Sequence, residues 1–318
     1  MRVLLSLALC AVFCSLSVAG EYPEKNIRMI VPYPAGGTTD ILARAIQQPT
    51  STLLGQPIII ENKGGGGGTI GTEAAARSQP DGYTIVFGNL GPNAIMVSFN
   101  SKAGYDAVKD FAAVSVVANM PLYLVANPAF PAKDMKQLLA LARSKPGELG
   151  FASVGTGSAS HVTGELFNVM ANVKLQHIPY KGGAPAMTDV LAGHVLLMFA
   201  TPLEALPHIN EGKLVVLGGT PRQRSSILPN VPPISETVPG FEVSVWFGVL
   251  APANTPSKIV AKLNSAVQRA VATPEVQGKL RSAGVDPTTT SPEDFGRIVA
   301  NDVEKWAKLV KTASLAAE

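Results

Sequence analysis

The chain has 318 residues, of which 46% are hydrophobic and 15% are charged, and its formal net charge at pH 7 is +3. This length and this share of apolar residues predict one large or two medium globular domains with buried cores. Because the charge is nearly balanced and no basic run is present, the composition argues against a nucleic-acid-binding surface, and we expect no nucleic-acid partner.

The first residues have the pattern of an export signal. A positively charged start precedes an uncharged apolar run over 3–18, and Ser17-Val18-Ala19 supplies the small residues of a signal-peptidase site. We therefore expect residues 1–19 to be a signal peptide that is cleaved after Ala19. Both cysteines, Cys10 and Cys14, fall inside this signal, so the mature chain is expected to have no disulfide and no thiol chemistry.

The stretch over 27–54 predicts a strand, a glycine turn and a helix. Apolar residues at 27–31 lead into a Pro/Gly turn that ends at Gly37, and Thr38 or Thr39 is the expected N-cap of the helix. Such a turn directs backbone N–H groups and a helix N-terminus to one point, which makes an anion-binding site. The alternative is an ordinary βα turn with a purely structural role.

Five consecutive glycines, Gly64 to Gly68, precede a helix that is predicted over 69–77. Gly66, Gly68 and Gly71 match the G-x-G-x-x-G spacing of dinucleotide-binding loops. That fingerprint requires an acidic residue at the end of the following strand, where this chain has Asn89. We therefore interpret the glycine run as a flexible loop beside the site and expect no cofactor.

A second glycine loop runs from Gly155 to Ser158 and leads into a helix that is expected to end at Ala171. A hydrolase that uses Ser158 and His161 is the enzymatic alternative, but the G-x-S-x-G elbow of such enzymes is absent. His161 and Glu165 are four residues apart, and no third metal ligand is evident. We therefore expect neither a catalytic site nor a metal site.

Strands and helices alternate along the chain, which predicts a doubly wound α/β architecture. Two crossings of the chain, near 118–124 and 242–248, are expected to divide it into two lobes. One lobe would consist of 20–121 and 246–318, and the other would be an insertion of 122–245. An export signal, two lobes and one glycine loop from each are the layout of a periplasmic binding protein, which closes on its ligand like a hinge.

Over its whole mature length the sequence resembles the Bug family (Bordetella uptake gene), the substrate-binding proteins of tripartite tricarboxylate transporters. The motifs that carry the resemblance occur in this order: Tyr22-Pro23, Ile30-Val31-Pro32, Pro34-Ala35-Gly36-Gly37 with Asp40, Leu54-Gly55-Gln56-Pro57, Pro80-Asp81-Gly82-Tyr83, Gly155-Thr156-Gly157-Ser158 with His161, Pro179-Tyr180-Lys181-Gly182, and Ala184-Pro185-Ala186 with Asp189. The resemblance implies a type II periplasmic-binding fold, a periplasmic location, no catalysis, and an organic carboxylate bound between the lobes.

The resemblance also assigns the ligand site. The first glycine loop is expected to hold one carboxylate, and the residues assigned there are Tyr33, Ala35, Gly36, Gly37 and Thr38. The remaining expected contacts are Asn89 from the first lobe and Gly157, Ser158, His161, Tyr180, Asp189 and Thr201 from the second. The expected partners of this monomer are a dicarboxylate, tricarboxylate or aromatic carboxylate and the membrane components of the transporter. A ligand-sensing subunit for a membrane receptor stays an alternative.

Overall fold

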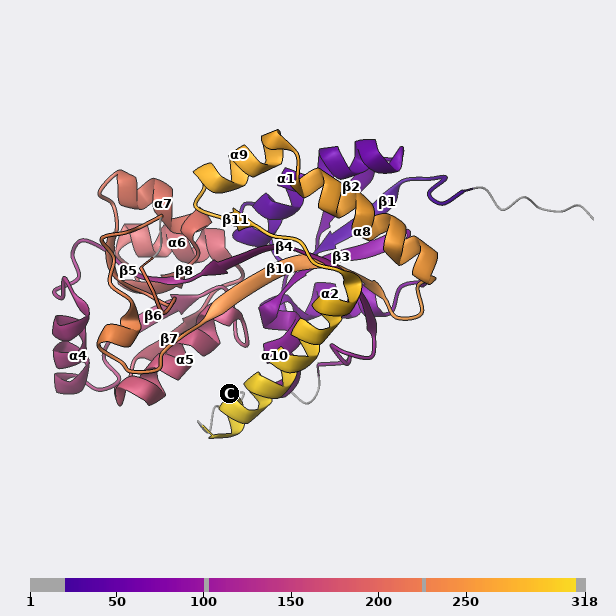
Figure 1. Ribbon diagram of the computed structural model, residues 1–318. Coiled ribbons are helices and arrows are strands. Elements are labelled where there is room, and N and C mark those ends of the chain that lie inside the picture. The colour runs from indigo at the N-terminus through magenta and orange to yellow at the C-terminus, as the bar shows by residue number, and fades with distance from the viewer. Residues whose placement is uncertain (1–20, 100–102, 225–226, 313–318) are drawn as a thin grey trace, which may run out of the picture.

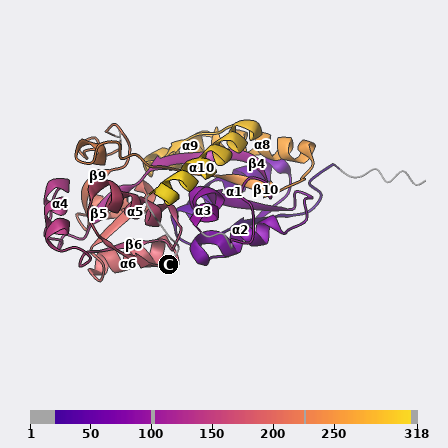
Figure 2. The same ribbon diagram turned by 90° about the horizontal axis from the view of Figure 1, so that it is seen from below.

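The computed structural model describes residues 21–99, 103–224 and 227–312, which form two α/β lobes, each built on one mixed sheet (Figure 1). The first lobe holds the N-terminal strand, and the second lobe holds the middle of the chain. Figure 2 shows α1, α2 and α3 in the first lobe and α4, α5 and α6 in the second. The predicted signal peptide, 1–19, lies outside the described residues.

The first lobe carries a six-stranded sheet in the order β11-β4-β10-β3-β1-β2. β1 is parallel to β2 and β3, whereas β10 is antiparallel to β3 and β4. The strands are β1 (Ile27–Val31), β2 (Ile58–Asn62), β3 (Thr84–Asn89), β4 (Phe111–Pro121), β10 (Ser244–Pro252) and β11 (Asp286–Pro287). The helical elements are α1 (Thr38–Leu54), η1 (Gly66–Gly68), α2 (Thr69–Ala76), the π-helix η2 (Gly91–Ile95), α3 (Met96–Phe99), α8 (Ser257–Val271), α9 (Pro274–Ser282) and α10 (Pro292–Thr312).

The second lobe carries a five-stranded sheet in the order β7-β6-β8-β5-β9. β6 is parallel to β7 and β8, whereas β5 is antiparallel to β8 and β9. The strands are β5 (Tyr123–Ala126), β6 (Gly150–Ser153), β7 (Gln176–Pro179), β8 (Leu197–Ala200) and β9 (Val215–Gly219). The helical elements are α4 (Met135–Ser144), α5 (Ala159–Ala171), α6 (Gly183–Ala192), α7 (Pro202–Asn210) and η3 (Ile234–Glu236).

The central strands have apolar residues on both faces because helices cover both faces of each sheet. In β1, the side chains of Met29, Ile30 and Val31 are fully buried, and all four residues of β8 are buried as well. This pattern confirms the predicted α/β architecture. Within the part of the chain that the structure describes, no helix has the length and apolarity to cross a membrane.

The chain passes between the lobes at two places that lie side by side. Leu122 separates β4 from β5, and the segment before β10 returns to the first sheet. Thr220 joins both passages: its hydroxyl donates to the Val243 carbonyl at 2.5 Å and accepts from the Leu122 amide at 2.9 Å. Ser244 already pairs with Pro121 in the first sheet. The predicted boundaries at 121/122 and 245/246 stay a prediction.

The carboxyl ends of the parallel strands point into the space between the lobes. β1 leads into α1 there, and β6, β7 and β8 lead into α5, α6 and α7. In open α/β sheets this edge is where ligands bind, because the loops and helix N-termini gather at it. The fold therefore brings four helix N-termini from two lobes to one place.

Candidate functional site: a cavity between two helix N-termini

A cavity lies between the two lobes at these strand ends, and we call it the interlobe cavity. Its volume is about 50 Å³, counted as the space that the centre of a water-sized molecule can reach. Its wall is formed by these residues of both lobes: Tyr33, Gly37, Thr38, Thr39, Asn89, Leu122, Val154, Ala159, Ser160, Gly183, Phe199, Thr201, Glu204, Val245 and Phe247. The wall combines apolar side chains with hydroxyl and amide groups, and among the described residues it includes no lysine, arginine or histidine.

The residues predicted from the resemblance fall into two groups. Those that line the interlobe cavity are Tyr33, Gly37, Thr38, Asn89 and Thr201. Those that lie outside its wall are Ala35, Gly36, Gly157, Ser158, His161, Tyr180 and Asp189. The structure also places residues in the wall that we did not predict, among them Thr39, Ser160 and Glu204.

The N-terminus of α1 is bound by the second lobe. We predicted Thr38 or Thr39 as the N-cap, but the structure has Gly37 in that position, with no side-chain cap of its own. The Thr38 amide instead donates to Glu204 Oε1 at 3.3 Å, and the Thr38 and Thr201 hydroxyls lie 2.5 Å apart. The predicted N-cap was wrong because the extended backbone ends at Gly37, so that Thr38 is already the first helical residue. The cap group at this helix start is a carboxylate from a distant part of the sequence.

The rest of the first glycine loop turns away from the interlobe cavity. Ala35 and Gly36 are exposed, and the Gly36 amide donates to Asp40 Oδ2 at 3.0 Å. Asp40 also accepts from Arg44 and Asn62, each at 2.9 Å. Although burial raises the pKa of Asp40, these hydrogen bonds outweigh it and hold the pKa below its usual value. The amides of Gly36 and Thr38 are thus both engaged by carboxylates of the protein itself.

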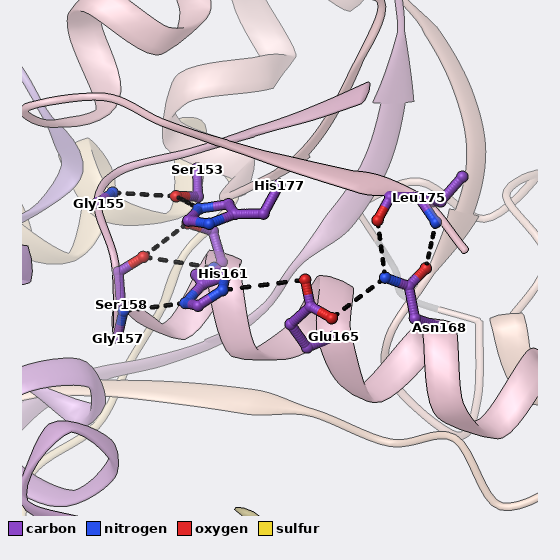
Figure 3. Close-up of polar contacts among 10 residues, drawn as sticks. Ser153, Gly155, Gly157, Ser158, His161, Glu165, Asn168, Leu175 and His177 are labelled. Atoms are coloured by element: carbon purple, nitrogen blue, oxygen red, sulfur yellow. Dashed lines mark hydrogen bonds and ion pairs between the residues drawn. The ribbon is translucent and has the colours of Figure 1, made fainter. Parts of the chain in front are cut away.

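The N-terminus of α5 is completed within the second lobe (Figure 3). Ser158 is the N-cap of α5, and its hydroxyl accepts from the His161 amide at 3.3 Å. The first two helical residues, Ala159 and Ser160, line the interlobe cavity. First-turn amides have no partner inside their own helix. This end of the cavity therefore presents the N-terminus of a helix to whatever occupies the cavity.

The His161 side chain holds the second glycine loop by a hydrogen bond to its backbone. Its Nδ1 accepts from the Gly157 amide at 2.9 Å, and its ring stacks on His177 at a centroid distance of 3.7 Å (Figure 3). Burial and the neighbouring His177 lower the pKa of His161 to about 3, and burial lowers the pKa of His177 to about 4. Both rings are therefore neutral at physiological pH, and a neutral Nδ1 is able to accept the Gly157 hydrogen bond.

The same contacts bear on the hydrolase alternative. The Ser158 side chain is fully buried, and its hydroxyl accepts from the His161 backbone and contacts the Ser160 hydroxyl at 3.2 Å. His161 Nδ1 is occupied by Gly157, and Nε2 faces Glu165 at 3.9 Å. A nucleophile needs a base within hydrogen-bond reach of its hydroxyl. In this geometry Ser158 acts as a helix cap, and His161 holds the loop.

Tyr33 and Asn89 shape the first-lobe wall. The Tyr33 hydroxyl donates to the Gly67 carbonyl at 2.8 Å, and burial raises the pKa of this phenol. The Asn89 amide group donates to the Thr39 hydroxyl at 3.1 Å. The glycine run serves the contact between the lobes, because a Cβ built on Gly67 would lie 2.1 Å from the Thr156 carbonyl oxygen of the second lobe.

Tyr180 and Asp189 form a separate polar group at the surface. The Tyr180 hydroxyl donates to Asp189 Oδ2 at 2.7 Å, and His194 Nδ1 lies 3.3 Å from Asp189 Oδ1. The side chain of Asp189 remains 35% exposed. Hydrogen bonds from Tyr180 and His194 lower the pKa of Asp189. These residues contact one another and lie outside the wall of the interlobe cavity.

Glu204 is the functional candidate that we missed in the sequence. The signal was present, because Thr201 and Glu204 have the S/T-x-x-E spacing of a capping box. The Thr201 hydroxyl caps α7 by accepting from the Glu204 amide at 3.4 Å, and it donates to Glu204 Oε2 at 3.2 Å. In a capping box the glutamate reaches back to the backbone of its own N-cap. Here Glu204 also reaches across to the other lobe, which local spacing does not encode.

Known proteins are similar to this chain over nearly its whole length. A family model described as the tripartite tricarboxylate transporter family receptor matches residues 42–315. BugT of Bordetella pertussis is 36% identical over 295 residues, which cover 92% of this chain and 90% of BugT.

Solved structures agree as well. MatC of Rhodopseudomonas palustris with bound malate has a TM-score of 0.88 at 34% identity and covers 91% of this chain and 100% of MatC. R. palustris Rpa4515 with adipate has a TM-score of 0.88 at 35% identity and covers 92% of this chain and 99% of that protein.

These matches confirm the predicted family and the periplasmic-binding fold. The family consists of binding proteins, so the hydrolase alternative is set aside. The chain belongs to the tripartite tricarboxylate transporter receptors and is a periplasmic solute-binding receptor without enzymatic activity.

Proposed function

We propose that this receptor captures a small organic carboxylate in the interlobe cavity and delivers it to the membrane components of a tripartite tricarboxylate transporter. The observation that carries the proposal is the N-terminus of α5, whose first two residues, Ala159 and Ser160, line this cavity. Helix N-termini attract anions through their unpaired amides and their dipole. MatC with malate and Rpa4515 with adipate are relatives with bound carboxylates.

Binding without a basic side chain in the wall is energetically adequate. A hydrogen bond to a charged group contributes about 1.5–3 kcal/mol. Micromolar affinity corresponds to about −8 kcal/mol. A few such bonds, together with the burial of an apolar ligand body against Phe199, Val245 and Phe247, reach this value after ordering costs are subtracted. Moderate affinity suits a receptor that must release its cargo.

A thermal-shift screen against a carboxylate panel, followed by calorimetric titration of each hit and of its primary amide, tests capture. We expect at least one small carboxylate to raise the melting temperature and to bind about 10-fold or more tightly than its amide, because the amide loses the charge-assisted bonds. Equal affinity of acid and amide for every hit would refute carboxylate capture. Loss of uptake of the identified ligand in a deletion strain tests delivery, and unchanged uptake would favour the sensing alternative.

Two further parts of the proposal concern the mature protein. We propose that it is exported to the periplasm with cleavage after Ala19, which N-terminal sequencing of periplasmic material tests. We also propose that it acts as a monomer, and light scattering of the purified protein tests this. A lipid-modified Cys14 at the terminus, or a dimeric mass, would contradict the respective statement.

A further inference from the structure

Part of the wall of the interlobe cavity is continuously apolar. Four of its residues belong to one hydrophobic cluster, and we call them the apolar wall: Leu122, Phe199, Val245 and Phe247. Leu122 lies where the chain crosses from β4 to β5, and Val245 and Phe247 follow the return crossing, in β10. Because Val245 and Phe247 are two residues apart on one strand, their side chains point to the same face. The apolar wall therefore lies where the chain passes between the lobes.

Packing fixes the apolar wall in place. Phe199 is fully buried, and its ring centroid lies 6.0 Å from that of Phe167 and 6.5 Å from that of Phe241. Val245 and Phe247 are buried as well. Side chains in a closely packed interior cannot turn aside without disturbing their neighbours. The wall thus presents carbon atoms to whatever occupies the cavity.

The hydroxyl and amide side chains of the cavity are hydrogen-bonded within the protein. Those with such partners are Tyr33, Thr38, Thr39, Asn89, Ser160 and Thr201. Asn89 is bonded through both of its polar atoms, since Nδ2 donates to Thr39 Oγ1 at 3.1 Å and Oδ1 accepts from the Gly91 amide at 2.9 Å. First-turn amides, in contrast, have no partner inside their own helix. The donors best placed for a ligand charge are therefore the amides at the start of α5.

A ligand in this cavity meets two different surroundings. Its carboxylate is stabilised at the amides of Ala159 and Ser160, and the rest of the molecule packs against the apolar wall. A hydroxyl or a second charge against the apolar wall would lose its water without gaining a partner, which lowers affinity by about 10-fold or more. A methylene group in the same place raises affinity about fourfold.

We propose that the ligand is an alkyl or aryl carboxylate whose end remote from the carboxylate is hydrocarbon and packs against the apolar wall. The wall then determines specificity, because it discriminates against acids that carry a hydroxyl, an amine or a second carboxylate at that end. This inference rests on the proposed function and narrows its ligand class from carboxylates in general to carboxylates with a hydrocarbon tail.

Pairs of ligands with nearly the same shape test the proposal. The pairs are valerate with 4-hydroxybutyrate and 4-methylbenzoate with 4-hydroxybenzoate, in which a hydroxyl replaces the terminal methyl group. Each is titrated calorimetrically at neutral pH into the full mature protein. For any pair that binds, we expect the methyl member to bind at least 10-fold more tightly. Malate and adipate, the ligands of the two relatives, are added to the panel as acids with a second carboxylate.

Two variants of β10 show where the discrimination arises. Val245→Thr exchanges a methyl group of the apolar wall for a hydroxyl of similar size, and we expect it to lower the affinity ratio of each binding pair at least threefold. Val249→Thr is the matched control, because Val249 is equally buried on the same strand but lies outside the cavity wall. It should leave the ratio unchanged. If either variant fails to fold, the ratios of the wild type still decide the proposal.

Each outcome separates the two claims. The inference is overturned, and carboxylate capture stays intact, if hydroxyl members bind as tightly as methyl members. The same conclusion holds if the tightest ligand of the panel has a polar group at its remote end. Equal ratios in Val245→Thr and Val249→Thr would overturn the assignment of the tail to the apolar wall. If no carboxylate of the panel binds to the wild type, the proposed function fails, and this inference fails with it.

Discussion

The two glycine loops begin alike in sequence and end differently in structure. Each follows a parallel strand and opens a helix at the interlobe cavity. The α1 N-terminus is capped from the other lobe by Glu204, whereas the α5 N-terminus is capped within its own lobe by Ser158. The cap of α5 is therefore formed within one lobe, while the cap of α1 depends on the contact between the lobes. A helix N-terminus alone does not reveal whether it is available to a ligand.

The largest expected effect comes from separating the lobes at the glycine run. In Gly67→Ala, the new Cβ would lie 2.1 Å from the Thr156 carbonyl oxygen, and a backbone atom cannot rotate away. The lobes must move apart, so a ligand held between them loses contacts from one side. We expect ligand affinity to fall about 100-fold, or about 2.7 kcal/mol, in calorimetric titration.

Gly55→Ala is the matched control for that variant. Gly55 also has a positive φ, +73° against +63° at Gly67, but nothing lies within 4 Å of a Cβ built on it. Both variants therefore share the strain of a left-handed alanine, about 1–2 kcal/mol of stability. If Gly67→Ala binds ligand as tightly as Gly55→Ala does, the contact between Gly67 and Thr156 is not needed for binding.

The second prediction sharpens the description of the α5 end. His161→Phe keeps an aromatic ring against His177 but leaves the Gly157 amide without its acceptor. A buried unpaired donor costs about 1–3 kcal/mol, and we expect the free energy of unfolding to fall by about 2 kcal/mol in urea titration. His161→Asn places a carbonyl oxygen near the position of Nδ1 and should recover part of this loss. Equal destabilisation by both variants would show that the Gly157 hydrogen bond contributes little.

The third prediction concerns pH. In the folded state the pKa of His161 is about 3, below the ordinary value of 6.5, because burial and His177 disfavour the charged ring. As the pH falls, His161 is therefore protonated in the unfolded chain before it is protonated in the folded protein. The stability that the neutral ring contributes above its ordinary pKa is lost on acidification. His161 alone should contribute a slope of about 1.4 kcal/mol per pH unit between about pH 6 and pH 4. His161→Asn should flatten the measured slope, and an unchanged slope would contradict the neutral, buried state of this ring.

The smallest effect is expected at the surface group formed by Tyr180 and Asp189. Tyr180→Phe removes a partly exposed hydrogen bond outside the cavity wall. Such surface changes are usually within about 0.5 kcal/mol of stability. We expect ligand affinity to change by less than about twofold in the same calorimetric assay. A large loss would mean that this group reaches the ligand after all, as the family resemblance suggested.

Local patterns predicted what depends on neighbouring residues. The helices that we predicted after Gly37, over 69–77 and up to Ala171 correspond to α1, α2 and α5. Strand and helix periodicity likewise predicted the two α/β lobes. These features follow from local backbone geometry and hydrogen bonding, which a sequence window contains.

Contacts between the lobes could not be predicted from local sequence patterns. Glu204 and Thr38 are 166 residues apart, and only the assembled fold shows that one caps the other. The role of Gly67 was also missed. We interpreted the glycine run as a flexible loop, but in the assembled fold Gly67 lies close to Thr156 of the other lobe. His161 was predicted from the resemblance as a ligand contact, but its ring nitrogens face Gly157 and Glu165. Which way a buried side chain points depends on packing partners that lie far away in the sequence.

The position of the ligand carboxylate tests the difference between the two loops most directly. A crystal structure of the receptor with the most tightly bound carboxylate from the screen provides that position. We expect the carboxylate within hydrogen-bond distance of the Ala159 and Ser160 amides, with Glu204 still bound to the Thr38 amide. A carboxylate on the Thr38 amide, with Glu204 turned out of the interlobe cavity, would contradict the assignment of both ends.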